Sequence, residues 1–274
     1  MSQAQDKDVI RTRIWAEETE PGNPFGARAA YCHGYDVYGA MVGNARWVEM
    51  LFLLLRGEAP SAQQANLLEA LAVTLANPGP RDPAVHAAMC GGVGGSTAAS
   101  CLMAALAVGA GQFCGAREVY LAMQAWSACG TQLGAWQAWI EQPPAPVTGI
   151  WPEVAGRPGF DAYAATSPGI VRAALAALAR RSPGPHLPWL AANLSALEAA
   201  AGGGVTLTAV AAAALIDLGF APAQGEMLCL LLRLPGAAAH ALEQQDYGHK
   251  KFPFFEVELA AESDDRVGRG GGSR

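Results

Sequence analysis

The chain has 274 residues, of which 51% are hydrophobic and 15% are charged, so it can bury a large core; this composition excludes a disordered or collagen-like protein. Its 18 Lys and Arg residues against 24 Asp and Glu residues give a net charge of −6. That sign is wrong for a protein that must neutralise many phosphates, so we expect no nucleic-acid partner.

The six cysteines are dispersed, with no CxxC pair and no histidine at the spacing of zinc ligands, so we expect reduced thiols and no metal site. The N-terminal sequence MSQAQDKDVIRTR lacks the apolar run of a secretion signal, which predicts a cytoplasmic protein. Two longer stretches, 119–140 and 199–216, carry no charge. Polar residues and glycines interrupt them, so we expect packed helices and no membrane span.

Abundant Ala and Leu, sparse β-branched residues and the helical spacing of the apolar residues predict a nearly all-α protein. Over 46–57 apolar residues surround the helix and a glycine follows, which is typical of a buried helix that ends there. Ser61, with Gln64 three residues later, predicts a capping box at the start of the next helix. The sequence NPGP at 77–80 is expected to end that helix.

A Gly- and Ala-rich stretch follows over 90–116, and its small side chains favour close packing of helices. Its GGVGG run is not a dinucleotide fingerprint, because no strand precedes it and no acidic residue follows at the required distance. Further helices are predicted over 169–181 and 207–218, between segments rich in glycine and proline. The polar, glycine-rich residues 263–274 are expected to form a disordered tail.

Three stretches, in the order of the chain, carry a resemblance to a known family. The first is GYD at 34–36 followed by WVEMLFLLLRGEAP at 47–60, and the second is GARE at 115–118. The third is LIDLGF at 215–220 followed by LRLPGAAAHALEQ at 232–244. These motifs resemble those of the citrate synthase and citryl-CoA lyase superfamily, and together they span most of the chain.

The resemblance implies an all-α fold with a large domain over 1–112 and 209–262, a small domain over 113–208 and an active site in the cleft between them. The family joins or splits a carbon–carbon bond between an acyl-CoA thioester and a 2-oxo acid. The implied ligands are therefore a CoA thioester and a carboxylate, with no further cofactor. The resemblance also implies a homodimer, or a heterodimer with an active relative.

Carried over position by position, the resemblance places residues without the required chemistry at the family's sites. The reaction needs a carboxylate base, a hydrogen-bond donor for the enolate and arginines for the acid. Phe113 stands where the family has its enolate-stabilising His, and Thr208 stands where it has its catalytic Asp. The segment that carries the ketone-binding His is shortened, with Gly169 at the position of an anion-binding Arg and Asp161 as the acid nearby. Pro78 replaces a further substrate-binding His.

Two residues could still carry chemistry. Arg233 stands at the position of an acid-binding arginine, and it either holds a carboxylate or pairs with a structural acid such as Glu226 or Glu243. Cys114 is the one new nucleophile beside the lost donor, although a buried thiol that packs as a small apolar group is the favoured interpretation.

We therefore predict a citrate synthase-like protein that has lost acyl-CoA condensation or cleavage and serves as a non-catalytic subunit or a ligand-binding protein. The alternative is a divergent lyase or acyltransferase on another CoA thioester, in which Arg233 grips a carboxylate and Asp161 or Cys114 supplies new chemistry. A third hypothesis is a helical scaffold whose cleft is filled by side chains. The residues expected to line the altered pocket are Pro78, Phe113, Cys114, Asp161, Gly169, Thr208 and Arg233.

Overall fold

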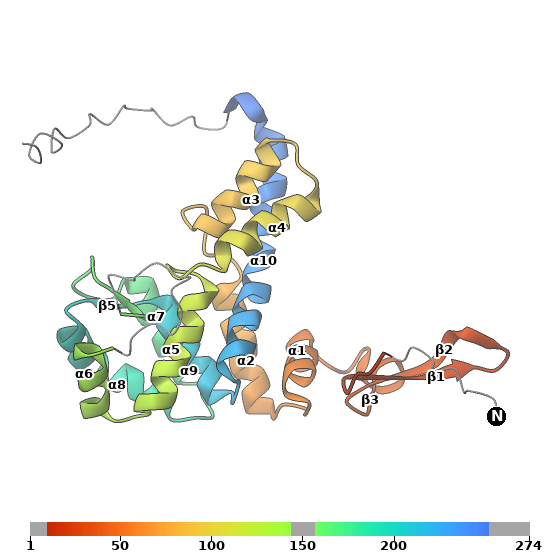
Figure 1. Ribbon diagram of the computed structural model, residues 1–274, viewed down its shortest axis with the longest axis horizontal. Helices are drawn as coiled ribbons and strands as arrows, with labels where there is room; N and C mark the ends of the chain where they lie inside the picture. The colour runs from red at the N-terminus through yellow and green to blue at the C-terminus, as the bar shows by residue number, and fades with distance from the viewer. Residues whose placement is uncertain (1–9, 144–156, 252–274) are drawn as a thin grey trace, which may run out of the picture.

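The computed structural model describes residues 10–143 and 157–251. Within these ranges the chain is mostly helical, as the sequence predicts, with a small sheet near its N-terminal end (Figure 1). None of the helices in the described part of the chain is long and apolar enough to cross a membrane. The tail predicted at 263–274 lies outside the described residues, and the division into two domains stays a prediction.

The first two helices begin and end where the local sequence signals place them. Helix α1 (Trp47–Arg56) ends at Gly57, whose φ of 78° is a left-handed conformation that glycine adopts readily. Helix α2 (Ala62–Leu75) begins after Ser61, whose side chain accepts a hydrogen bond from the Gln64 amide at 3.2 Å. The Gln64 side chain accepts one from the Ser61 amide at 2.9 Å, so the predicted capping box is confirmed.

The Gly- and Ala-rich stretch forms part of a small helical lobe. Helices α3 (Pro83–Val93) and α4 (Ala98–Gly109) pack against each other and against the C-terminal part of the long helix α10 (Pro222–Tyr247), beyond the main body (Figure 1). Small residues fill this contact, so the three backbones approach closely. The buried cluster between them consists of Val85, Ala88, Cys101, Ala105, Ala237 and Ala241.

Gly92 marks the closest approach of α3 to α10, and Gly92→Ala is expected to lower the free energy of unfolding by about 1–3 kcal/mol through overpacking. A Cβ atom there would lie 2.2 Å from the Ala241 carbonyl oxygen, which is backbone and cannot move aside alone. Urea denaturation measures the change. Gly134→Ala is the control, because a Cβ atom at Gly134 meets nothing within 4 Å. Equal effects of the two substitutions would contradict the close contact.

The main body is built around helix α9 (Leu207–Asp217), in which every residue from Ala209 to Leu215 is buried. This helix packs against α5, α7 and α8, and α10 packs on α5. Helices α7 and α9 lie within the ranges that the sequence predicts. The other helices of the body are α5 (Ala116–Cys129), α6 (Leu133–Glu141), α7 (Gly169–Ala179) and α8 (His186–Ala201).

A short antiparallel ladder holds the segment before α7 against the turn between α8 and α9. Strand β4 (Phe160–Asp161) pairs with β5 (Gly204–Val205). The ladder therefore places Asp161 opposite Gly204, in the turn that precedes α9 and Thr208. The remaining short helical turns are η1 (Val37–Met41) and η2 (His249–Lys251).

The N-terminal sheet is a feature that the sequence analysis missed. Strands β1 (Trp15–Glu20), β2 (Asn23–Cys32) and β3 (Tyr35–Asp36) form an antiparallel sheet in the order β1-β2-β3. The sheet projects from the body on the far side of α1 (Figure 1). Most of its residues are exposed or half-buried, so neither face produces the alternation of apolar and polar residues that identifies a half-buried strand.

Candidate functional site

Four of the residues predicted to line the altered pocket surround one cavity of about 180 Å³, which we call the inner chamber. Pro78 follows α2, Cys114 precedes α5, Thr208 lies in the first turn of α9 and Arg233 belongs to α10. The chamber therefore lies where one end each of α2, α5 and α9 meets the side of α10. Its other lining residues are Thr74, Leu75, Asp82, Val119, Thr206, Leu207, Ala211 and Cys229.

A second cavity of about 400 Å³, the outer chamber, contains Phe113 and Asp161 among its lining residues. Cys114 and Thr206 line both cavities, so the two chambers are neighbours. Gly169 lines neither chamber and instead begins α7 at the surface. The other residues of the outer chamber are Gln112, Glu118, Leu121, Arg157, Pro158, Phe160, Ala162 and Tyr163.

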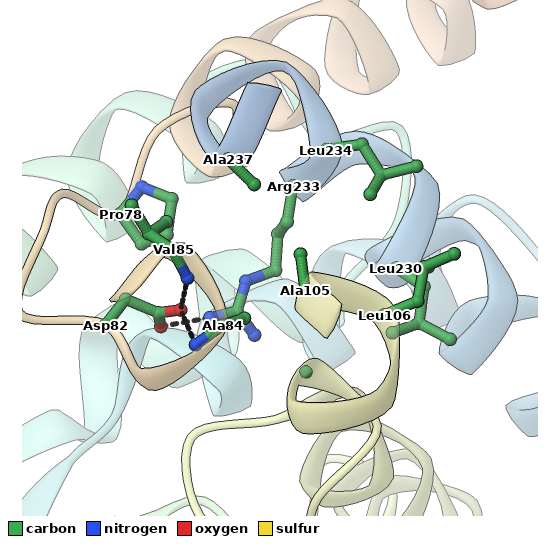
Figure 2. A pocket seen from close by; sticks show the side chains of 11 residues that line it. Pro78, Asp82, Ala84, Val85, Ala105, Leu106, Leu230, Arg233, Leu234 and Ala237 are labelled. Carbon is green, nitrogen blue, oxygen red and sulfur yellow. Dashed lines mark hydrogen bonds and ion pairs between the residues drawn. The ribbon is translucent and has the colours of Figure 1, made fainter. Parts of the chain in front are cut away.

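Arg233 is held by protein groups on its guanidinium. Its Nη1 donates a hydrogen bond to the Cys114 carbonyl oxygen at 2.8 Å, and its Nη2 forms an ion pair with Asp82. The two side chains are 11% and 8% exposed, so this pair is largely out of water. Figure 2 shows the guanidinium directed at the Asp82 carboxylate. The hollow that both side chains line has a volume of only about 10 Å³.

The acid that pairs with Arg233 was predicted wrongly. Glu226 lies 3.5 Å from Arg117, and Glu243 lies 3.5 Å from His240, so both candidates have other partners. Asp82 also caps α3, because its Oδ1 accepts hydrogen bonds from the backbone amides of the first turn at 3.0 and 3.3 Å. One carboxylate thus begins a helix and neutralises a cation that lies far away in the sequence.

Glu118 is a buried carboxyl group at the base of the outer chamber, with 7% of its surface exposed. Its Oε1 accepts hydrogen bonds from the Gly159 amide at 3.0 Å and the Thr206 hydroxyl at 3.3 Å, and its Oε2 accepts one from the Cys114 amide at 2.9 Å. Burial raises the pKa of Glu118, although these hydrogen bonds oppose the shift. Sequence reasoning quoted Glu118 within the motif at 115–118 but did not treat it as a site residue.

Two threonines connect Glu118 to the inner chamber. The Thr206 and Thr208 hydroxyl oxygens lie 2.6 Å apart, and Thr206 also caps α9 by accepting from the Ala209 amide at 3.3 Å. A hydrogen-bonded chain therefore runs from Glu118 through Thr206 to Thr208. The carboxyl group that these hydrogen bonds connect to Thr208 therefore belongs to Glu118 on α5, and not to a residue of α9.

The two thiols of the inner chamber are poor nucleophiles. Cys114 is exposed, so the expectation of a buried thiol is wrong. Partial desolvation, together with the negative charges of Glu118 and Asp82, nevertheless raises the pKa of Cys114. Burial raises the pKa of Cys229 to about 11. Because the thiolate is the reactive form, neither residue is activated for covalent chemistry.

The inner chamber carries little charge for chemistry on acids, whereas Arg157 lines the outer chamber. The charged residues that line the inner chamber are Asp82 and Arg233, which neutralise each other. In the part of the chain that the structure describes, no group of three or more His, Cys, Asp or Glu side chains could hold a metal ion. The two chambers together offer apolar walls, hydroxyl groups, the buried Glu118 carboxyl group and the Arg157 guanidinium, which donates to the Ile140 and Ala201 carbonyl oxygens.

Comparison of the sequence with protein-family models gives no match, and comparison with curated proteins gives none either. Solved structures, by contrast, are clearly similar. Citryl-CoA lyase from Hydrogenobacter thermophilus superposes with a TM-score of 0.70 at 19% identity, over 93% of this chain and 96% of the lyase.

Two larger enzymes match as well. ATP citrate lyase from Methanothrix soehngenii, in complex with citrate and coenzyme A, matches with a TM-score of 0.70 at 15% identity. A variant of ATP citrate lyase from Methanosaeta concilii, in complex with (3S)-citryl-CoA, matches with a TM-score of 0.68 at 15% identity. Each match covers 94% of this chain but 43% of the enzyme, so the chain spans less than half of their length. The fold that the motifs implied is confirmed: this chain has the fold of citryl-CoA lyase.

Proposed function

We propose that this chain is a ligand-binding protein that keeps the citryl-CoA lyase fold and no longer makes or breaks the carbon–carbon bond of an acyl-CoA thioester. The observation that carries the proposal is the pairing of Arg233 with Asp82. An acid-binding arginine has to offer its guanidinium to the substrate's carboxylate. Here a carboxylate of the protein already occupies that guanidinium.

The groups at the other family positions support the same proposal. Thr208 offers a hydroxyl in place of a carboxylate base, and that hydroxyl is engaged with Thr206 at 2.6 Å. Phe113 is 66% exposed beside the outer chamber and offers a hydrocarbon ring where a hydrogen-bond donor is needed. Loss of one acid–base group alone typically slows a reaction by about 10²- to 10⁴-fold.

A direct assay tests the proposal. The purified chain is incubated with citryl-CoA, and separately with acetyl-CoA and oxaloacetate, and citryl-CoA, acetyl-CoA and free CoA are separated chromatographically. We expect no conversion of either thioester above a protein-free control, while an active citryl-CoA lyase converts citryl-CoA to acetyl-CoA and oxaloacetate under the same conditions. Conversion that grows in proportion to the concentration of the chain would overturn the proposal.

The second candidate is a divergent lyase or acyltransferase that uses Glu118 in place of the family's base. It is favoured by one observation, the hydrogen-bonded chain from this buried carboxyl group to Thr208. Such an enzyme would convert one of the thioesters in the assay above, and Glu118→Gln would abolish the conversion. If the chain is non-catalytic, neither the wild type nor Glu118→Gln shows activity in this assay.

We also propose that two copies of the chain associate through the outward face of α4. This helix carries no charged residue, and Ala99, Met103 and Ala107 face outward at a spacing of four residues, with Met103 60% exposed. Exposed apolar patches of this kind mark interaction sites. Analytical ultracentrifugation is expected to show a dimer, and Met103→Glu is expected to give a monomer. A wild-type monomer at all concentrations would contradict this, leaving a heterodimer with an active relative as the other form of association.

A further inference from the structure

We propose that the inner chamber binds a small uncharged ring compound with one hydroxyl group, such as a phenol or a cyclic alcohol, rather than a di- or tricarboxylic acid. This inference rests on the proposed function, since a working lyase has to admit the acid. It gives that function a ligand class, and it follows from the size, lining, charge and hydroxyl geometry of the chamber.

The size of the chamber sets the size of the ligand. Its volume is about 180 Å³. An engineered apolar cavity of about 150 Å³ in another protein stays dry and binds benzene. The inner chamber, which opens to the surface, can therefore hold a six-membered ring with one substituent, whereas it cannot hold the whole of a CoA thioester.

The lining of the chamber sets its polarity. Leu75, Val119, Leu207 and Ala211 present hydrocarbon to the cavity, and they come from α2, α5 and α9. Cys229 adds a thiol that stays neutral, because burial raises its pKa to about 11. Transfer of an apolar ring from water to such walls is favourable in proportion to the area buried.

The charge state of the chamber excludes acids. The Arg233 guanidinium is engaged by the Asp82 carboxylate and by the Cys114 carbonyl oxygen. An entering carboxylate would find no free cation among the lining residues, and an unpaired anion is costly to bury. A second carboxylate would also lie close to Asp82 and be repelled by it.

The hydroxyl groups of Thr206 and Thr208 determine where the polar group of the ligand lies. When Glu118 is ionised, it only accepts hydrogen bonds: Thr206 donates to its Oε1 at 3.3 Å, and the Thr208 hydroxyl, 2.6 Å from that of Thr206, directs its hydrogen to Thr206 or to Glu118. A hydroxyl group has one donor hydrogen and two acceptor lone pairs, so Thr208 retains acceptor capacity at the wall of the chamber. A ligand hydroxyl can donate to that oxygen while its ring occupies the apolar part.

The experiment uses phenol and benzene as probes, with citrate as the charged competitor, and measures binding to the full chain by calorimetry and ligand-detected NMR. Phenol and benzene are expected to bind the wild-type chain, and citrate is expected not to displace them. Thr208→Val removes the acceptor without changing the shape of the side chain. It should weaken phenol about fivefold, as expected for one hydrogen bond, and leave benzene unchanged.

A second variant tests the location independently. Ala211→Leu fills the chamber from α9 and should abolish the binding of both probes. Ala191→Leu makes the same substitution on the exposed surface of α8 and should leave both affinities unchanged. Circular dichroism and urea denaturation confirm that each variant is folded. If Ala211→Leu does not fold, Thr208→Val decides the outcome alone.

The inference is overturned if neither probe binds, if citrate displaces phenol, or if Thr208→Val weakens phenol and benzene equally. These outcomes are separate from the test of the proposed function. Conversion of a thioester would overturn the loss of catalysis without altering the phenol titration, whereas absence of phenol binding without such conversion would overturn the ligand class alone.

Discussion

Arg233→Met is expected to lower the free energy of unfolding by about 3–5 kcal/mol, as is typical when one partner of a buried ion pair is removed. The substitution keeps most of the side-chain volume but leaves the Asp82 carboxylate, which is 8% exposed, without its cation. It also removes the donor to the Cys114 carbonyl oxygen. Urea denaturation followed by circular dichroism measures the change.

Two controls separate the ion pair from other effects. Asp82→Asn combined with Arg233→Met removes both charges and keeps a good cap for α3, so the double variant should recover most of the lost stability. Arg28→Met breaks an exposed pair with Glu18, whose side chains are 61% and 45% exposed, and should cost under about 1 kcal/mol. A similarly small loss of stability for Arg233→Met would contradict the stabilising ion pair and favour the interpretation of Arg233 as an acid-binding residue.

The helices could be predicted because their signals are local. The capping box of Ser61 with Gln64 and the glycine after Arg56 each act within one turn, so they determine where α1 ends and α2 begins whatever the rest of the chain does. The N-terminal sheet could not be predicted in the same way. Strands β1 and β2 bury few side chains, and pairing between Trp15 and Cys32 depends on contacts along the hairpin rather than on hydrophobic periodicity.

The site could be predicted in part, and only through the resemblance. It placed Pro78, Cys114, Thr208 and Arg233 in one pocket, and these residues line the inner chamber. It could not supply the partner of Arg233, because Asp82 is 151 residues away and its sequence context reads as an ordinary helix cap. Residues this far apart meet only when the helices pack, and a single sequence contains no pattern that predicts this contact.

Glu118 was overlooked for a related reason. In the sequence it is one acidic residue in the first turn of a helix, a position that favours acids for electrostatic reasons alone. Two of its hydrogen-bond partners lie far away in the sequence: Gly159 is 41 residues from Glu118, and Thr206 is 88 residues from it. No His, Asp or Glu stands within two residues of Thr208 in the sequence, whereas the hydrogen bonds through Thr206 lead to a carboxyl group on another helix.

Asp217→Ala is expected to lower the free energy of unfolding by about 3–5 kcal/mol, because it leaves several buried donors without an acceptor. The Asp217 side chain is 0% exposed at the end of α9. It accepts hydrogen bonds from the Ser182 hydroxyl at 2.6 Å, from the His186 ring Nδ1 at 2.7 Å and from the His186 and Leu187 amides at 2.9 Å each. One carboxylate thus ties the start of α8 to the end of α9, the helix that supports Thr208.

The pH dependence of this stabilisation has a definite sign. Burial opposes ionisation of Asp217, but the hydrogen bonds from His186, Ser182 and the amides outweigh it and lower the pKa. The stabilisation is therefore complete above the unfolded-state pKa of about 3.8 and is lost as the pH falls through the lower folded-state value. The difference in unfolding free energy between wild type and Asp217→Ala should shrink below that pH.

Asp36→Ala is the control, because it removes a cap on the peripheral turn η1 and should lower the free energy of unfolding by only about 1 kcal/mol. Equal losses for Asp217→Ala and Asp36→Ala would contradict the central role of Asp217.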